Sequence, residues 1–272
     1  MQVIKSTGAL ECFDHKKIYN TIRAAGGSKK LASLAVKEVK RKFKKNSSSE
    51  EILKFLVGYL KQEPGVSQRY NLKRAIMALG PTGFPFERFF ARVLKYHGYK
   101  TTVDNKLKGK RIIQEVDIVA TDTEKDIKWM IECKFHNLDG TITKLHPALY
   151  TYARFLDLKR YNFDFPWLVT NTKCSKDAIE YSKGVNLKTT SWNYPREESL
   201  QVLVEKKQAY PITILTSVTN EEINKFYDAN LVVTKDLLIE DLRELSRRVK
   251  IDEKRLVKII EEVKDICEEE EN

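Results

Sequence analysis

The segments Glu115-Val116-Asp117-Ile118-Val119 and Met130-Ile131-Glu132-Cys133-Lys134-Phe135 decide the fold, because each alternates charged and apolar residues. Such alternation is typical of a β-strand, in which residues two apart share a face. Glu132 and Lys134 therefore project together. The turn-like residues 121–125 between the segments allow them to pair as antiparallel neighbours, which predicts that Asp117 lies beside Glu132 and Lys134.

Strand-like and helical patterns alternate on both sides of this pair. The sequence predicts strands over 99–103, 112–120, 129–135, 167–170 and 187–192, and helices over 85–97, 147–158 and 176–183. This alternation indicates an α/β sheet domain, which we place at residues 83–195. The Gly80-Pro81-Thr82-Gly83 break marks its start.

The flanking regions have mainly helical patterns. Residues 1–79 begin with short strand-like pieces and continue into helices expected over 31–43, 50–61 and 68–79. Residues 200–272 have a helical pattern, and no glycine follows Gly184. The expected fold is therefore an α/β chain with a helical N-terminal domain, a central sheet domain and an all-helical C-terminal module.

Charge and composition narrow the function classes. The 272 residues have a formal net charge of +11, which divides into +11 for residues 1–80, +6 for 81–195 and −6 for 196–272. A basic surface attracts polyphosphates, although a lysine-rich solubility surface is the alternative. No apolar run approaches the ~20 residues of a membrane span, and no signal peptide is evident, so we expect a cytoplasmic protein that does not bind membranes. The four cysteines form no CxxC pair, which argues against a zinc site or a disulfide scaffold.

The cluster of Asp117, Glu132 and Lys134 has a chemical interpretation. Carboxylate oxygens suit Mg²⁺ or Mn²⁺, and such a cation can polarise a phosphodiester and activate a water molecule. The alternative is an ordinary cross-strand ion pair on a solvated face.

The arrangement of Asp117 followed by Glu132-x-Lys134 resembles the signature of the PD-(D/E)xK nuclease superfamily, and the surrounding chain resembles its Mrr-type restriction-endonuclease branch. Phe86-Glu87, Gly98-Tyr99 and Leu168-Val169-Thr170 match further features of that branch. The resemblance implies that Asp117 and Glu132 bind Mg²⁺ or Mn²⁺, that Lys134 is the catalytic lysine, and that Glu87 completes the site. It also implies DNA as the substrate, and a homodimer would allow two sites to cut both strands.

The N-terminal residues from Val3-Ile4-Lys5 through Gly8, Glu11 and Phe13-Asp14 to Lys17-Ile18 resemble the ATP-cone domain. This family binds ATP or dATP as an effector. The resemblance implies a nucleotide site at Val3, Lys5, Glu11 and Lys17, where two lysines can converge on phosphates. The alternative is a basic helical module that binds DNA or a partner and no nucleotide.

The C-terminal residues 200–272 look like a degenerate helix–hairpin–helix region, with Asp228-Ala229-Asn230 at the hairpin. A packing or dimerisation role is the alternative, since the segment is acidic and lacks hairpin glycines. Together the features predict a metal-dependent DNA endonuclease regulated by ATP or dATP. Two alternatives are a nucleotide-responsive DNA-binding protein with a weak or inactive nuclease fold, and an assembly protein whose oligomerisation responds to ATP.

Overall fold

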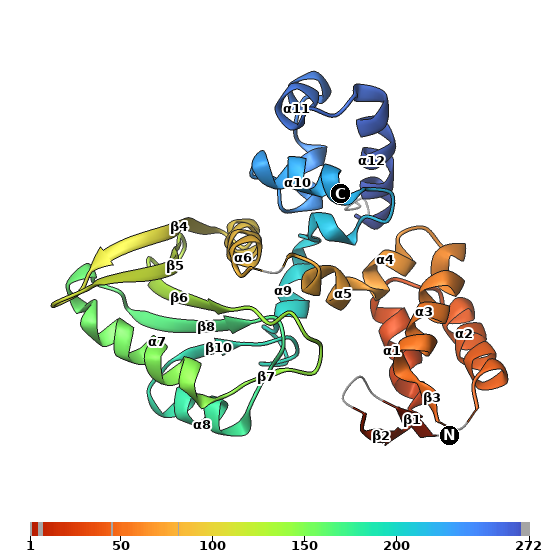
Figure 1. Ribbon diagram of the computed structural model, residues 1–272, viewed down its shortest axis with the longest axis horizontal. Helices are drawn as coiled ribbons and strands as arrows, with labels where there is room; N and C mark the ends of the chain where they lie inside the picture. Colours follow the sequence, from red (N-terminus) through yellow and green to blue (C-terminus); the bar gives the residue numbers. More distant parts are fainter. Residues whose placement is uncertain (1, 5–7, 45, 81, 268–272) are drawn as a thin grey trace. The chain divides into compact units, whose positions relative to one another are not determined.

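The computed structural model describes residues 2–4, 8–44, 46–80 and 82–267 (Figure 1). Contacts divide the chain into two compact units. Residues 76–212 and 226–236 form one, here called the sheet unit; residues 1–75, 213–225 and 237–272 form the other, here called the helical unit. None of the described helices is both long enough and apolar enough to cross a membrane.

The sheet unit contains a five-stranded mixed sheet in the order β10-β8-β6-β5-β4. Strands β4, β5 and β6 are antiparallel neighbours, whereas β6, β8 and β10 run parallel. Parallel neighbours require a crossover, and helix α7 makes the one between β6 and β8. The strands are β4 Tyr99–Lys108, β5 Ile113–Asp122, β6 Lys128–Lys134, β8 Phe165–Thr170 and β10 Lys188–Thr190.

Helices pack against this sheet because their apolar residues recur at helical spacing. In α6 (Phe84–Tyr96), Phe86, Phe89 and Phe90 are fully buried, and the Phe90 ring meets Trp167 of β8 edge to face at 5.5 Å. Helix α6 contacts β4 and β5, whereas α7 contacts β6 and β8. The remaining elements include α7 Leu145–Asp157, α8 Lys176–Gly184, α9 Leu200–Lys207 and the short pair β7 Ile142–Thr143 and β9 Lys173–Cys174.

The N-terminal part of the helical unit combines a small sheet with a helical core. Strand β1 pairs with β2 antiparallel and with β3 parallel. Ser48 begins α3 with a capping box completed by Glu51, as the Ser-x-x-Glu pattern predicts. The elements are β1 Gln2–Ile4, β2 Leu10–Cys12, α1 His15–Ala24, α2 Lys29–Lys42, β3 Ser47–Ser48, α3 Ser49–Tyr59, α4 Val66–Tyr70 and α5 Leu72–Met77.

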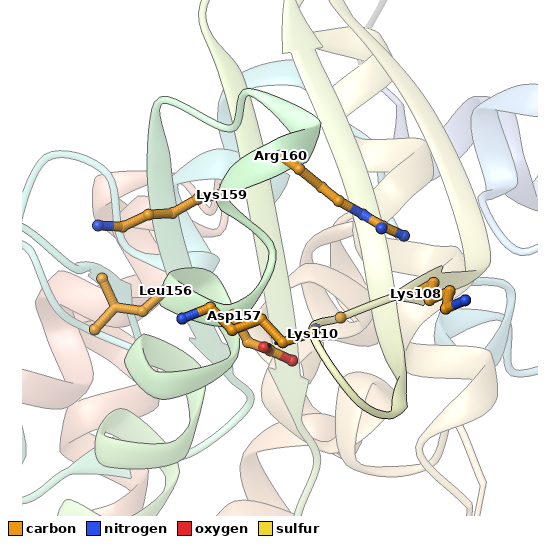
Figure 2. A pocket seen from close by; sticks show the side chains of 7 residues that line it. Lys108, Lys110, Leu156, Asp157, Lys159 and Arg160 are labelled. Atoms are coloured by element: carbon orange, nitrogen blue, oxygen red, sulfur yellow. Dashed lines mark hydrogen bonds between the residues drawn. The ribbon is translucent and has the colours of Figure 1, made fainter.

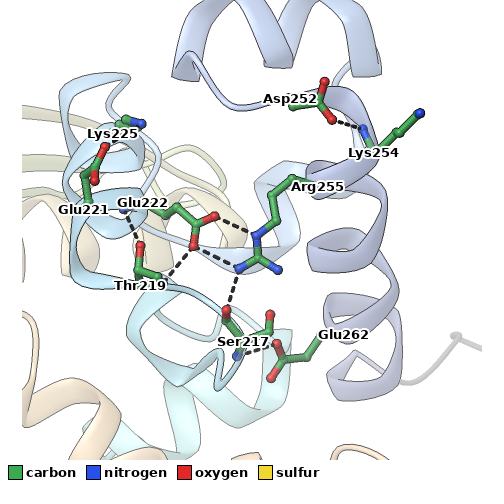
Figure 3. A network of polar contacts seen from close by, with 9 residues as sticks. All are labelled: Ser217, Thr219, Glu221, Glu222, Lys225, Asp252, Lys254, Arg255 and Glu262. Atoms are coloured by element: carbon green, nitrogen blue, oxygen red, sulfur yellow. Dashed lines mark hydrogen bonds and ion pairs between the residues drawn. The ribbon is translucent and has the colours of Figure 1, made fainter.

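The C-terminal part of the helical unit is held by a polar network (Figure 3). Arg255 donates to both carboxylate oxygens of Glu222, and Glu262 accepts hydrogen bonds from the backbone N–H groups of Thr216 and Ser217. Gln68 of α4 also donates to Glu262, which ties the C-terminal helix to the N-terminal part of the same unit. The helices are α10 Asn220–Asp228, α11 Leu242–Val249 and α12 Glu253–Ile266.

The expected α/β class is confirmed, with helices before and after a central sheet region. The helix expected over 68–79 is wrong in detail, because the chain forms α4 and α5 with a break at Asn71. The strand expected over 99–103 extends to Lys108, since polar residues that face solvent continue the ladder with β5. The division into segments 1–79, 83–195 and 200–272 stays a prediction.

Candidate active site

Asp117 and Glu132 face each other across the β5–β6 pair. Ile118 pairs with Ile131, so the residue before Ile118 lies opposite the residue after Ile131. The Asp117 carboxylate is half-buried and accepts a hydrogen bond of 2.6 Å from the Cys133 N–H, which fixes it against β6. Glu132 is 8% exposed. The structure thus brings together the two carboxylates that the sequence places side by side.

Helix α7 supplies the groups that contact Glu132. The Tyr150 hydroxyl donates to Glu132 Oε1 at 3.0 Å, and Arg154 forms an ion pair with Oε2. The Arg154 guanidinium also lies 5.6 Å from the centre of the Tyr150 ring. Tyr150 and Arg154 lie on one face of α7 because they are four residues apart.

Glu87 approaches the same cluster from the first turn of α6. Its carboxylate passes close to Gly83, where an added Cβ would lie 3.3 Å from Glu87 Oε1. Burial, followed by the charges of Asp117, Asp104 and Glu132, raises the pKa of Glu87 to about 7. The three sequence-predicted acids therefore share one electrostatic environment, although they come from three different elements.

Asp104 is a fourth acid, which sequence reasoning missed. The pairs Val103–Ile118 and Asn105–Val116 flank it, so Asp104 lies opposite Asp117 in the β4–β5 ladder. Its φ of 56° is in the left-handed region, which aspartate tolerates better than most residues. Arg88 lies 4.0 Å from its carboxylate, and the Asp104 charge raises the pKa of both Glu87 and Asp117.

The cluster has a surplus of negative charge. Burial and the neighbouring Asp117 raise the pKa of Glu132 to about 7, even though Arg154, Tyr150 and Lys134 act in the opposite direction. Burial also raises the pKa of Asp117. Carboxylates that crowd together in this way are stabilised by an added cation.

The donor set fits a hard divalent cation in its chemistry, since all candidate ligands are carboxylate oxygens. In the described part of the chain, however, no group of three His, Cys, Asp or Glu side chains is arranged so that it could hold a metal ion. The guanidinium of Arg154 supplies positive charge to Glu132 in this arrangement.

Lys134 ends β6, two residues after Glu132, and is half-buried opposite Thr170 of β8. The positive charge of Lys134 offsets part of the rise in the pKa of Glu132. His136 follows the strand end, where its Nε2 lies 2.8 Å from Thr143 Oγ1 and its backbone N–H donates to Asn171. These hydrogen bonds hold the loop after β6, so His136 has a structural role.

The expected nucleotide site lies partly within the described residues. Val3 is buried in the core of the helical unit and pairs with Glu11 across β1 and β2, and the Glu11 side chain is exposed. Lys17 is exposed in the first turn of α1, where its N–H donates to the capping carboxylate of Asp14. Lys5 lies outside the described residues. The Val3 side chain packs inward, within the hydrophobic core.

Comparison with known proteins defines the class to which these domains belong. The family model of the ATP cone domain matches residues 1–76, and that of the Mrr-type restriction endonuclease domain matches residues 80–195. The chain is therefore an ATP-cone domain fused to an Mrr-like domain, as the motifs indicated.

A third family model, AF1548-like, C-terminal, matches residues 210–267. An uncharacterized protein of Archaeoglobus fulgidus is 43% identical over 164 residues, which cover 59% of this chain and 91% of that protein. The crystal structure of AF1548, a protein of unknown function, is 37% identical, covers 68% of this chain and 98% of that chain, and has a TM-score of 0.60. This chain belongs to the AF1548-like family.

Proposed function

We propose that this protein is a metal-dependent DNA endonuclease whose activity is regulated by ATP or dATP. The observation that carries the proposal is the convergence of Glu87, Asp117 and Glu132 from α6, β5 and β6 beside Lys134, within a domain matched by the restriction-endonuclease family model. The excess of partly buried carboxylates supports this proposal, because a divalent cation would balance charge that the neighbouring arginine and lysine leave.

In this proposal, Asp117 and Glu132 hold Mg²⁺ or Mn²⁺, and Glu87 supports the site from α6. When bound, the cation polarises the phosphodiester and lowers the pKa of a water molecule. Lys134 orients the attacking water or neutralises charge on the phosphate. Arg154 pairs with Glu132, and its guanidinium would be available to contact a DNA phosphate if a bound cation balanced Glu132 instead.

The N-terminal domain supplies the regulatory site. Lys5 and Lys17 contact the phosphates of ATP or dATP, and Glu11 and the backbone at Val3 contact the base or ribose. Nucleotide binding adjusts the activity or the formation of a homodimer. A cytoplasmic location with DNA and nucleotide as partners is part of the same proposal.

Cleavage of plasmid DNA with Mg²⁺ or Mn²⁺, with and without ATP, tests this function. We expect wild-type protein to nick or linearise the plasmid, Lys134→Ala to abolish cleavage, and Lys125→Ala to retain it. Lys125 is a matched control because it is an exposed lysine of the β5–β6 turn in the same unit. Cleavage that persists in Lys134→Ala and Asp117→Ala would contradict the proposal.

The Arg154–Glu132 ion pair favours a second candidate, a nucleotide-responsive DNA-binding protein with a weak or inactive nuclease fold. If the Arg154 guanidinium permanently takes the place of a metal ion beside Glu132, the protein binds DNA without cutting it. DNA binding that responds to ATP, without cleavage under any metal, would support this candidate over the first.

A further inference from the structure

A hollow lined by basic residues lies beside α7, in a part of the sheet unit to which the proposed function assigns no role. Figure 2 shows Lys108 and Lys110 on the hairpin between β4 and β5, and Lys159 and Arg160 on the segment after α7. The hollow has a volume of about 700 Å³, and its other lining residues are Gly109, Leu156 and Asp157. All four cationic side chains are exposed, so they can reach a ligand.

The hairpin is held in place by two polar anchors. Asp157 accepts one hydrogen bond from the Lys110 N–H at 3.0 Å and another from the Gln114 amide at 2.8 Å. The Tyr161 hydroxyl accepts from the Lys108 N–H at 2.9 Å and from Arg160 at 3.0 Å. The backbone that carries Lys108 and Lys110 is therefore fixed against the segment that carries Lys159 and Arg160.

Gly109 lies where the β4–β5 hairpin closely approaches the end of α7. A Cβ at this position would lie 1.9 Å from Asp157 Oδ2 and 2.8 Å from its Cγ, so only glycine fits without movement. The Asp157 carboxylate that accepts these bonds is the single acid of the lining. Both Asp157 oxygens accept hydrogen bonds. The lining therefore has four cationic side chains and one carboxylate.

Helix α7 contributes residues both to the hollow and to the acid cluster. Asp157 follows Arg154 by three residues on α7, and Arg154 contacts Glu132. Three residues are slightly less than one helical turn of about 5.4 Å. The hollow and the acid cluster therefore draw residues from the same end of α7.

We propose that this hollow binds a backbone phosphate of duplex DNA, and so positions the strand for the acid cluster. The inference rests on the proposed function for the identity of its ligand. It adds a contact that orients DNA through the backbone, independent of base sequence.

Fluorescence anisotropy with a labelled 30-base-pair duplex tests the hollow, using the full chain in EDTA so that no cleavage occurs. We expect Lys108→Gln/Lys110→Gln to weaken binding about tenfold near 0.15 M salt and to reduce the slope of log affinity against log salt by about 0.9 for each phosphate that is no longer neutralised. The matched control is Lys125→Gln/Lys206→Gln, which removes equal charge from exposed positions on the β5–β6 turn and α9. It should change affinity by less than about twofold, because distant surface charges are screened.

Gly109→Ala tests the geometry without changing charge. We expect it to weaken DNA binding in the same direction by separating the hairpin from Asp157, with circular dichroism confirming a folded chain. If this variant does not fold, the lysine variants alone decide. Calorimetry with ATP separates a DNA phosphate from a free nucleotide: Lys108→Gln/Lys110→Gln should bind ATP as wild type does.

Equal DNA affinity of the hollow and control variants would overturn the inference and leave the nuclease proposal standing. A loss of ATP affinity with unchanged DNA affinity would also overturn it. Weakened DNA binding in the hollow variants, together with wild-type protein that never cleaves DNA, would support the inference and contradict the nuclease. Wild-type protein that does not bind DNA would overturn both.

Discussion

Two glutamate–arginine pairs, one in each unit, show how differently the same chemistry can be used. Glu132 pairs with Arg154 in the sheet unit, and Glu222 pairs with Arg255 in the helical unit. The two glutamate side chains are similarly covered, with 11% and 13% of their surfaces exposed. The exposed fractions alone therefore do not distinguish the sites, whereas the depth of burial of each carboxylate and the charges around it do.

Their carboxylates nevertheless shift in opposite directions. Two hydrogen bonds from Arg255 and one from the Thr219 N–H lower the pKa of Glu222 to about 2 (Figure 3). Burial and the charge of Asp117 raise the pKa of Glu132 to about 7 despite Arg154. The Glu222 site is electrically satisfied, whereas the Glu132 site has more acid than its own cations balance. We infer that the first serves stability and the second serves ligand binding.

The largest effect that would sharpen this contrast is on cleavage. In Asp117→Asn, which keeps size and removes charge, we expect the rate of metal-dependent DNA cleavage to fall by about 10²–10³-fold, as when one preorganised charge-stabilising group is removed. Glu222→Gln should cleave at the wild-type rate at a temperature where it is folded. Single-turnover cleavage of a labelled duplex measures both, and equal losses in the two variants would erase the distinction.

The next largest effect is on stability without metal. Arg154→Gln removes the guanidinium that pairs with Glu132, and we expect the free energy of unfolding to fall by about 1–3 kcal/mol. Added Mn²⁺ should restore more stability to this variant than to wild type, because it replaces the missing positive charge. Thermal unfolding with and without Mn²⁺ tests this, and Arg154→Lys is the conservative control. An absence of metal-dependent recovery would count against a cation site.

A smaller effect is expected at the satisfied pair. Glu222→Gln removes one charge from a well-formed pair and should lower the free energy of unfolding by about 1–2 kcal/mol. Glu221→Gln is a matched control on the same helix, since Glu221 pairs with Lys225 but is 78% exposed. Its effect should stay below about 0.5 kcal/mol. Chemical denaturation of both variants measures the difference, and a larger loss for Glu221→Gln would contradict the comparison.

The smallest effect is the pH dependence of the contribution that Glu222 makes to stability. An unfolded glutamate has a pKa of about 4.3, whereas folded Glu222 has one of about 2. Its stabilising contribution is therefore complete above about pH 4.3 and is lost as the pH falls toward 2. The stability difference between wild type and Glu222→Gln should shrink across that interval. A difference that stays constant from pH 6 to pH 2.5 would contradict the lowered pKa.

The sequence predicted the sheet part of the candidate site because strand alternation is a local property. The spacing of Glu132 and Lys134 and the short connection to Asp117 sufficed to place these residues together. Glu87 required the family resemblance, since nothing local says that the start of α6 reaches β5. Asp104 could have been suspected from the polar pair Asp104-Asn105 within a strand-like stretch, but its position opposite Asp117 depends on the register of β4.

The contacts that α7 makes with Glu132 could not be predicted from local sequence patterns, for a different reason. The sequence places Tyr150 and Arg154 four residues apart in an expected helix over 147–158, without indicating what they contact. That they meet Glu132 depends on how the crossover helix docks on β6, which is a long-range property of the fold. The Arg255–Glu222 pair is likewise set by tertiary packing, because its members are 33 residues apart.

Calorimetric titration of Mn²⁺ into the full chain tests most directly the claim that Glu132 belongs to a cation site and Glu222 does not. We predict saturable binding by wild type and by Glu222→Gln, and its loss in Glu132→Gln, with circular dichroism showing that all three are folded. Equal Mn²⁺ binding by wild type and Glu132→Gln would contradict the account.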